Sequence, residues 1–451
     1  YDLQKAFIES PAGKENFVLG AHFQRRQDYA PAGADFVRNT RATELNLNGS
    51  RNIRRVLQWA GNFTWRRLEV QDPARTTQQP AETFLARTDL GITLWKGAFR
   101  SNTTYEIGSG QEPRLEFTYI RVRQGEGTHI WLDSLNNNDG IIQPNEMEPA
   151  PFSDLADFVR VPTVSNEFIR ADYVNLLQSW QLEPRAIWFN TKGWKQFLSK
   201  FAFQSSVKTG RRTRSAPGVQ TWNPLQWNIP DTALVAGNAA TRHLLFFNRA
   251  HPKWDLQAGI SDVWNKTVQT TGFEDRRNRE QFLRGRLNLS KPFSALATAT
   301  WSRRSSDSEF FNNRDFDIAG FALEPQLNWQ PARQFRLTAR YKFQTDFNQL
   351  PGGGEQSERH DLSAETAFNK AGAWALRSRF SYIRVAFDGA ANSPVGFAIL
   401  NGLQRGNNWL WNIGLDRQLA KNLQLSIQYE GRQTGAGRMV HVGRASVGAV
   451  F

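Results

Sequence analysis

Residues 334–344 read QFRLTARYKFQ, and their side chains alternate between apolar and polar. Phe335, Leu337 and Tyr341 fall on one face of an extended chain, whereas Arg336 falls on the other. An apolar side chain at every second position is the period of a half-buried β-strand and does not fit the 3.6-residue period of a helix. The segment therefore predicts a strand with one apolar and one charged face.

The same alternation recurs along the chain. The segments run for about 10 to 14 residues, longer than the usual soluble strand and matched to a tilted bilayer crossing of about 9 to 11 residues. We predict about 18 strands, within a range of about 16 to 20, since single-chain bacterial barrels have even strand numbers. The predicted strands are 15–28, 37–49, 53–68, 82–95, 97–121, 166–183, 194–209, 239–250, 253–266, 280–290, 294–303, 316–328, 334–345, 357–369, 373–386, 407–418, 421–432 and 438–451.

The connections between these segments alternate in length. Short turns are expected at 49–53, 95–98, 290–294, 330–334, 369–373 and 419–422. Long polar loops are expected at 211–238, 267–280, 303–315, 346–357 and 387–406. Tight periplasmic turns and long extracellular loops are typical of bacterial outer-membrane barrels. The predicted fold is an all-β transmembrane antiparallel β-barrel, a single domain over residues 1–451 in the outer membrane of a Gram-negative bacterium.

Composition agrees with strands that cross a membrane. The mean hydropathy is −0.57 over 451 residues, and there is no cysteine. No apolar run reaches the length of about 18 residues that a membrane-spanning helix needs. The 16 Trp and 32 Phe residues suit the aromatic girdles at the membrane interfaces. A soluble all-β protein with ordinary core aromatics is the alternative.

The net charge of +14 is spread over the strands and forms no tail or helical stripe. A basic surface without a recognition helix or zinc-finger motif is weak evidence for nucleic-acid binding, so we expect no nucleic-acid partner. The basic side chains instead predict a lumen that favours anions, because they outnumber the lumen acids Asp416 and Glu430. The predicted lumen-lining basic residues are Arg66, Arg284, Arg286, Arg336, Arg340, Arg377, Arg379 and Arg444. The equal alternative is that these arginines pair with acids of the loops or with lipopolysaccharide phosphates near the rim.

Apolar side chains also occupy every second position in the C-terminal segment. Ala445, Val447, Ala449 and Phe451 would face lipid. A terminal aromatic residue on such a strand resembles the signal that delivers outer-membrane proteins to the barrel-assembly machinery. The predicted partners are that machinery, outer-membrane lipid and lipopolysaccharide, and other outer-membrane or surface proteins.

A predicted insertion at 122–165 contains the one local motif with metal chemistry. Counted so that Gly140 takes the turn position of a calcium loop, hard oxygen ligands fall at nearly alternate places. The predicted Ca²⁺ ligands are Asp133, Asn137, Asp139, the carbonyl of Ile141, and Glu146. Leu135 occupies the first position and cannot bind a cation, so Asp133 would have to replace it. The alternative is an Asn/Asp/Gly turn cluster with solvated acids.

The stretch GEGTHIWLDSLNNNDGIIQPNE, followed by ADFVRVPTVSNEFIRADYVNLLQSWQLEPRAIW, resembles the closing third of a family of large outer-membrane proteins of Bacteroidota. In that family a Gly-x-Gly-x-Tyr-x-Trp hairpin leads into an Asn/Asp/Gly loop that ends in Glu-Phe-Glu. Here the ending is Glu146, Met147, Glu148, and an extra residue pair precedes the glycine. The resemblance implies an outer-membrane location and a longer N-terminal portion, and it implies no activity.

Three functions follow from this fold. A barrel of about 18 strands has an interior too wide for side chains alone to fill, which favours a porin-like channel or transporter with a basic lumen. The alternative is a non-conducting scaffold or accessory barrel of a secretion, assembly or surface-anchoring complex, with the loop 211–238 as a lumen plug or partner-binding segment. An outer-membrane hydrolase is disfavoured, because none of the six histidines lies in a nucleophile elbow or a HExxH motif.

Overall fold

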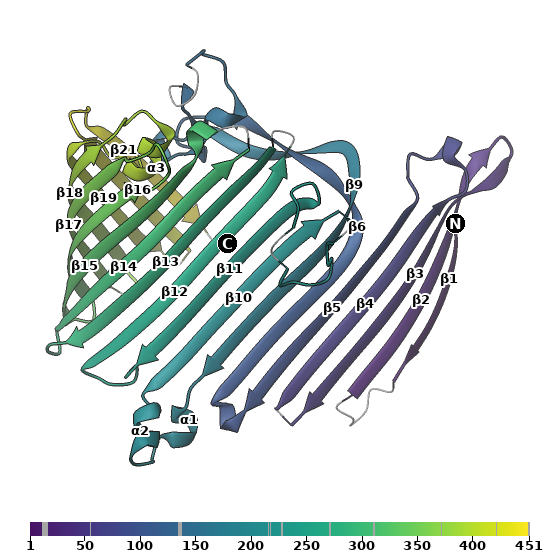
Figure 1. The fold of residues 1–451 in the computed structure, drawn as a ribbon, viewed down its shortest axis with the longest axis horizontal. Coiled ribbons are helices and arrows are strands. Elements are labelled where there is room, and N and C mark those ends of the chain that lie inside the picture. The colour runs from purple at the N-terminus through teal and green to yellow at the C-terminus, as the bar shows by residue number, and fades with distance from the viewer. Residues whose placement is uncertain are drawn as a thin grey trace. The chain divides into compact units, whose positions relative to one another are not determined.

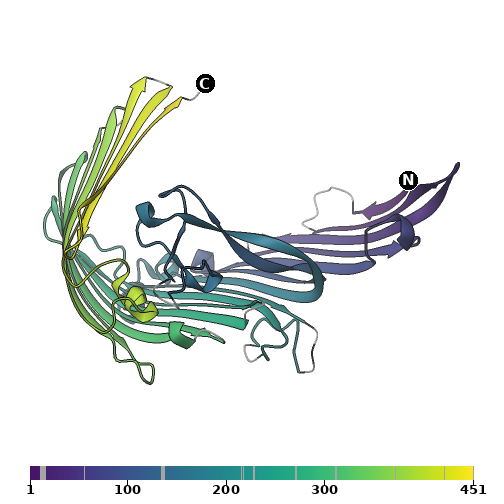
Figure 2. The same cartoon turned by 90° about the horizontal axis from the view of Figure 1, so that it is seen from above.

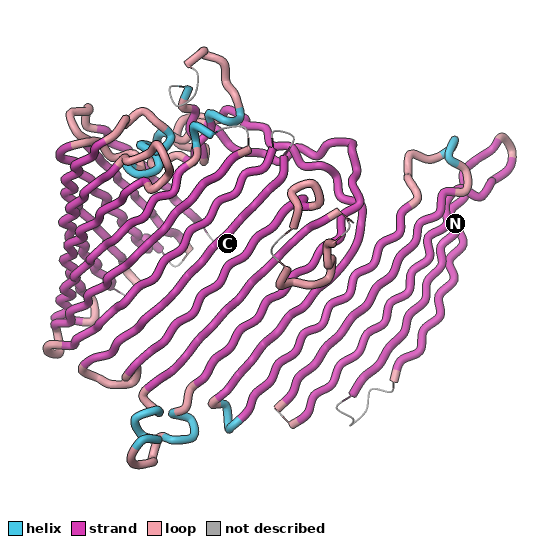
Figure 3. Tube along the Cα trace, viewed as in Figure 1, coloured by secondary structure: helices cyan, strands magenta, loops and turns pink. Residues whose placement is uncertain are grey.

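The computed structural model describes residues 1–10, 17–54, 56–133, 138–214, 216, 218–226, 229–269, 272–309, 312–370, 372–420 and 422–449. Strands make up most of these residues, and the helices are short (Figure 3). No helix among the described residues has the length and hydropathy needed to cross a membrane.

The strands are numbered in chain order, and Figure 1 labels most of them. They are β1 (Asp2–Glu9), β2 (Phe17–Ala32), β3 (Asp35–Ile53), β4 (Leu57–Val70), β5 (Ala81–Leu94), β6 (Phe99–Arg121), β7 (His129–Trp131), β8 (Met147–Pro149), β9 (Phe158–Leu182), β10 (Phe201–Thr213), β11 (Leu234–Phe247), β12 (Trp254–Gln269), β13 (Gly272–Asn288), β14 (Phe293–Ser308), β15 (Phe316–Ala332), β16 (Phe335–Asn348), β17 (Gln356–Lys370), β18 (Trp374–Asp388), β19 (Gly406–Ala420), β20 (Leu423–Thr434) and β21 (Val440–Ala449). The helices are α1 (Arg185–Trp188), α2 (Trp194–Leu198) and α3 (Pro394–Leu400), with 3-10 turns η1 (Pro73–Arg75), η2 (Trp95–Gly97), η4 (Pro144–Glu146), η5 (Ser153–Leu155) and η6 (Asn312–Arg314).

The described strands form one antiparallel sheet of 21 strands. Two of them, β7 and β8, have three residues each and belong to the inserted segment, so nineteen longer strands remain. The predicted range is confirmed.

The chain divides into two compact units. Unit 1 comprises residues 1–116, 164–245 and 261–274, and unit 2 comprises 117–163, 246–260 and 275–451. In unit 1, strands β1 to β6 pair in sequence order and β9 pairs with β10. In unit 2, strands β14 to β21 pair in sequence order, each antiparallel to the next.

These strands expose their apolar face and bury polar side chains on the other face, which is the reverse of the arrangement in a soluble protein. On β16, the apolar face exposes Tyr341 to 39%, while Thr338 and Asp346 on the other face are exposed to only 6% and 2%. Leu362 of β17 lies directly opposite Tyr341 and is 58% exposed. Water would not favour an exposed apolar row beside a buried polar row, whereas hydrocarbon on one side and a polar interior on the other would. The fold is therefore that of the transmembrane β-barrel class, as predicted.

The structure corrects the predicted strands at two places. Residues 194–198, predicted as the start of a strand, form α2, and β10 begins only at Phe201. Trp194, Phe197 and Leu198 have the i, i+3, i+4 spacing of a helical face, which the strand prediction overlooked. Strand β1 was not predicted, because its apolar Phe7 and Ile8 are adjacent and therefore point to opposite faces.

Predicted connections are also shorter in the structure, because strands extend into them, as β14 does to Ser308 and β16 to Asn348. The loop predicted at 267–280 is wrong, because β12 continues to Gln269 and β13 starts at Gly272. Its EDRRNREQ segment is polar on both faces, so alternation gave no signal for a strand there. The inserted segment ends before Phe158, where β9 begins, and not at residue 165. We call residues 122–157 the insertion.

Candidate functional site

Charged and polar side chains line one face of unit 2 in rows that cross the strands. Directly opposed pairs connect Thr338 to Glu365, Arg379, Asn412 and Glu430 across β16 to β20. Directly opposed residues of antiparallel strands point to the same face, so these five side chains form one row. We call this side of the strands the polar face.

The neighbouring row contains three of the predicted lumen arginines. Direct pairing leads from Arg336 through Ala367, Arg377, Gly414 and Gln428 to Arg444. We call Arg336, Arg377 and Arg444 the arginine row. Among the described residues, Arg336 and Arg377 form no ion pair, and both are exposed.

The structure places the other predicted lumen arginines as follows. Arg66 lies opposite Glu44 of β3 and Thr83 of β5 in unit 1. In unit 2, Arg284 donates to the Thr298 hydroxyl at 3.3 Å, and Arg286 pairs with Asp255. Arg340 lies 3.3 Å from Glu324, and Arg379 belongs to the Thr338–Glu430 row.

The polar face carries more acids than the sequence analysis assigned to it. Asp346 lies 3.6 Å from Arg304 and is 1% exposed as a side chain. Asp361 lies opposite Lys342, and Oδ1 of its carboxylate is buried without a hydrogen-bond partner among the described residues. The sequence analysis placed only Asp416 and Glu430 there; Glu324 and Asp361 share the parity of the polar positions of their own strands, and Asp346 lies just beyond the predicted strand end at residue 345. The resulting surface is a mixed-charge lining with a cationic row.

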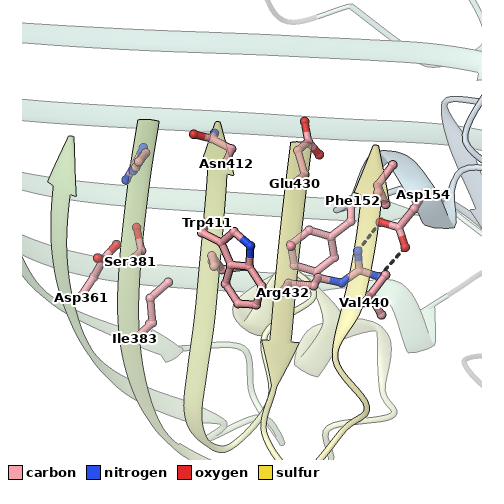
Figure 4. Close-up of a pocket in the computed structure, with 14 residues that line it drawn as sticks. Phe152, Asp154, Asp361, Ser381, Ile383, Trp411, Asn412, Glu430, Arg432 and Val440 are labelled. Atoms are coloured by element: carbon pink, nitrogen blue, oxygen red, sulfur yellow. Dashed lines mark hydrogen bonds and ion pairs between the residues drawn. The ribbon is translucent and has the colours of Figure 1, made fainter. Parts of the chain in front are cut away.

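The insertion is bound to this polar face through a buried ion pair. Both terminal nitrogens of Arg432 on β20 donate to the carboxylate of Asp154, with Nη2 to Oδ2 at 2.7 Å (Figure 4). The two side chains are only 12% and 18% exposed. The Arg432 guanidinium also lies 4.3 Å from the ring centroid of Phe152, which adds a cation–π contact. One residue of the strand wall thus holds both a charge and a ring of the insertion.

Further contacts spread the attachment over unit 2. Arg314 in η6 forms an ion pair with Glu148, whose side chain is 17% exposed. Arg444 of the arginine row donates to the Gly125 carbonyl at 3.2 Å. Phe152 packs so closely on Gly402 that a Cβ there would lie 2.7 Å from the ring. The insertion and α3 lie on the same side of the C-terminal strands (Figure 2).

Helix α3 is also fixed by arginines of the polar face. Arg359 donates to the Ile399 carbonyl at 2.9 Å, and Arg304 donates to the Ala398 carbonyl at 3.4 Å. These carbonyls lie at the C-terminus of α3, where cations are favourable. Its apolar side chains Val395, Ile399 and Leu400 pack into a buried cluster with side chains of β15 and β18. The insertion and α3 therefore both narrow the space beside the polar face.

A cavity of about 330 Å³ remains between the insertion and the strands. Phe152 and Asp154 of the insertion line it together with Asp361 and Glu430 of the strands (Figure 4), and Arg379 is a further lining residue. It offers charged groups of both signs and the unpaired carboxylate oxygen of Asp361. Such a lining suits water or a small polar solute.

The glycines of the GEGTHIW motif have separate roles at the base of the insertion. Gly125 has φ +88°, a conformation that favours glycine. A Cβ on Gly127 would lie 2.7 Å from the backbone nitrogen and oxygen of Phe158. Only a residue without a side chain allows β7, which pairs with β8, to start beside β9.

Three of the predicted metal ligands converge. One carboxylate oxygen from each of Asp133, Asp139 and Glu146 lies within 4.8 Å of the other two. The Glu146 carboxylate accepts from Trp131 Nε1 at 2.7 Å, and Oδ1 of Asp133 is buried without a hydrogen-bond partner in the described part of the chain. The backbone nitrogen of Ile141 donates to Asp139 at 2.7 Å. Asn137 lies outside the described residues, as does Phe451 at the C-terminus.

Comparison with known proteins gives a structural likeness only. No family model matches the chain, and no curated protein matches its sequence. The structure is similar to the ferric-catecholate import receptor Fiu of Escherichia coli K12, with 8% identity, coverage of 99% of this chain and 73% of that chain, and a TM-score of 0.43. It is similar to the siderophore receptor PirA of Pseudomonas aeruginosa, with 9% identity, coverage of 100% and 73%, and a TM-score of 0.40. It is also similar to OmpF of Salmonella typhi, with 8% identity, coverage of 89% and 97%, and a TM-score of 0.34.

The location follows from the strands themselves. Their length, their antiparallel order and their exposed apolar row match hydrocarbon, and their other face is polar. Antiparallel barrels with these features are typical of the bacterial outer membrane. The chain is an outer-membrane protein.

Proposed function

We propose that the chain is a porin-like channel or transporter that favours anionic solutes, with a passage narrowed by the insertion. The arginine row carries this proposal. Arg336 and Arg377 are exposed on the polar face and form no ion pair among the described residues, so their charge is free to act on a solute. Rings of Arg or Lys favour anions in pores of this kind.

The other charges of the polar face support the assignment without adding to its selectivity. Arg340 and Arg304 lie beside Glu324 and Asp346, which offset their charges. A solute on the polar face would therefore meet compensated charge at these two pairs and uncompensated positive charge at Arg336 and Arg377. We expect the arginine row to set the preference for anions over cations, and the insertion to limit the passage of solutes.

Planar-bilayer recording of the purified chain under a KCl gradient tests this function. The reversal potential should show anion preference, and the double variant Arg336→Gln/Arg377→Gln should shift it toward cations. The matched control is Arg417→Gln, since Arg417 is an exposed arginine on the other face of β19, opposite Trp374. An unchanged reversal potential in the double variant would remove the arginine row from the function.

The second candidate is a non-conducting scaffold or accessory barrel of a membrane protein complex. The observation that favours it is the inward packing of two segments, the insertion and α3, beside the same polar face. Such a barrel would be silent in the bilayer, both as purified and after Asp154→Asn, and would copurify with other outer-membrane or surface proteins.

We also propose that the insertion binds Ca²⁺ through Asp133, Asp139 and Glu146. Their convergence within 4.8 Å supports this, because adjacent carboxylates repel each other without a cation. A chelator should increase protease cleavage between residues 125 and 165, and Glu146→Gln should do the same without a chelator. The control Glu126→Gln removes an exposed acid of the same segment. Cleavage that responds to neither treatment would leave the acids as a solvated turn cluster.

We propose no hydrolytic activity. His243 Nδ1 lies 2.9 Å from the Ser205 hydroxyl, and the His243 ring stacks on Phe203. Ser205 lies directly opposite Trp180, which is 41% exposed on the apolar face. No carboxylate among the described residues bonds to His243, so a third group that would orient the ring is lacking there. Hydrolysis of an ester or peptide substrate that is lost in His243→Ala would contradict this.

A further inference from the structure

The connection between β9 and β10 carries an exposed aromatic surface at the end of unit 1. It spans residues 183–200 and contains α1 and α2, beside the turn η2 that joins β5 to β6 (Figure 1). The backbone nitrogen of Glu183 donates to the Ala98 carbonyl at 2.6 Å and fixes the two connections together. Trp95 is 61% exposed, Trp194 is 64% exposed and Phe197 is 53% exposed. We call residues 95–97 and 183–200 the aromatic cap.

The aromatic cap continues the apolar face of the strands. Phe197 contacts Phe201 with ring centroids 5.4 Å apart. Phe201 shares its face with Phe203, two residues later, and Phe203 lies opposite Leu182. Leu182 is itself 36% exposed. The apolar surface that faces hydrocarbon along β9 and β10 therefore extends without interruption into α2.

Cations surround these rings and no free acid accompanies them. The exposed basic residues are Lys96, Arg185, Lys192, Lys195 and Lys200. Glu183 is the one acid of the segment, and it accepts from Gln181 at 2.9 Å. Arg185 lies 5.0 Å from the Phe189 ring centroid and Lys195 lies 5.7 Å from that of Trp194, so charge and ring are adjacent at both helices. Among the described residues these cations form no ion pair.

We propose that the aromatic cap is seated in the headgroup layer of the periplasmic leaflet and binds anionic phospholipid there. Aromatic rings with flanking Lys and Arg are the composition of interfacial membrane segments. Each basic side chain near an anionic surface gains about 1 kcal/mol, or a factor of about five. The short turns mark the periplasmic end, and continuity with the lipid-facing row makes the bilayer the surface in reach. The inference does not depend on the proposed channel.

Because the chain has no cysteine, a nitroxide can be attached at one chosen position. Phe197→Cys and, as a second site, Trp194→Cys would be labelled in the full chain and inserted in phosphatidylcholine vesicles with and without phosphatidylglycerol. The nitroxide should be shielded from a water-soluble nickel chelate, accessible to oxygen, and more deeply placed when phosphatidylglycerol is present. Arg54→Cys in the exposed turn between β3 and β4 is the control and should be equally open to nickel in both vesicles.

Lys192→Gln/Lys195→Gln/Lys200→Gln in the same labelled chain should abolish the phosphatidylglycerol-dependent shift and leave the shielding in phosphatidylcholine. High salt should reduce the shift in the parent chain. Nickel access at both labelled positions equal to that at residue 54 would overturn the proposal and leave the aromatic surface for a periplasmic protein. A shift that survives the triple variant would overturn the role of the lysines.

Discussion

Two long connections of this protein pack against opposite kinds of strand face. The insertion of unit 2 binds the polar face through Asp154 and Arg432. The β10–β11 connection of unit 1, residues 214–233, packs instead on the apolar face. Its Trp222 meets the Phe84 ring edge-on at 5.0 Å, and Phe84 lies opposite Trp65 in the apolar row of β4 and β5.

Side-chain donors of the strands hold the backbone of the connection 214–233. Arg211 donates to the carbonyls of Gln226, Gln220 and Thr221 at 2.6, 2.7 and 3.1 Å. Tyr105 donates to the Trp222 carbonyl. This connection is therefore no plug of the polar side, which was one of its two predicted roles. The insertion is held on the polar face by a carboxylate–guanidinium pair, whereas the connection 214–233 is held on the apolar face by an aromatic contact and by carbonyls that accept from Arg211.

The largest expected effect is on the insertion. Asp154→Asn leaves the charge of Arg432 buried without its partner, and breaking a buried pair in this way costs about 3 kcal/mol. Protease cleavage within 122–157 should rise by about a hundredfold when opening is in fast equilibrium. The control Asp157→Asn breaks a pair with Arg121, which is 74% exposed and 3.8 Å away, and should change little. Equal protection in Asp154→Asn would mean that the pair does not hold the insertion.

A smaller effect is expected on the connection 214–233. Trp222→Ala removes the contact with Phe84, and an aromatic pair contributes about 1 kcal/mol beyond the area it buries. Hydrogen exchange of residues 218–226 should accelerate severalfold, while the insertion keeps its protection. Leu225→Ala is the control, because that side chain is 63% exposed. A change at the insertion would show that the two connections are coupled.

The smallest expected effect is a pH dependence that the insertion shows and the connection 214–233 does not. Burial lowers the pKa of His129 in β7, the nearby Arg160 and Arg276 lower it further, and Glu148 opposes them. A histidine whose folded pKa lies below its unfolded value contributes stability above about pH 6.5, and that contribution is lost as pH falls through the folded pKa. Protease cleavage of the insertion should therefore rise modestly between pH 7 and pH 5, and His129→Gln should flatten the profile. Residues 218–226 contain no histidine and should not respond; a parallel response there would assign the effect to the barrel as a whole.

Sequence periodicity was sufficient where a strand crosses the membrane with two unlike faces, as at 334–344. It failed where that contrast is absent. Residues 274–281 are polar on both faces, and in β1 the apolar side chains of Phe7 and Ile8 are neighbours. The candidate site was predictable in part: Asp133, Asp139 and Glu146 were recognised by spacing within one segment. Asp361 and Arg432 were not, since the residues that surround them lie on other strands or in the insertion.

The sequence by itself determined the fold class, because a period of two needs only neighbouring residues and the bilayer supplies the surface that receives the apolar face. It also determined which arginines share a face with other polar residues. Only the tertiary structure decided which charges meet. Asp154 and Arg432 are 278 residues apart in the chain, and no local pattern encodes their contact. The strand register and the path of the insertion bring them together.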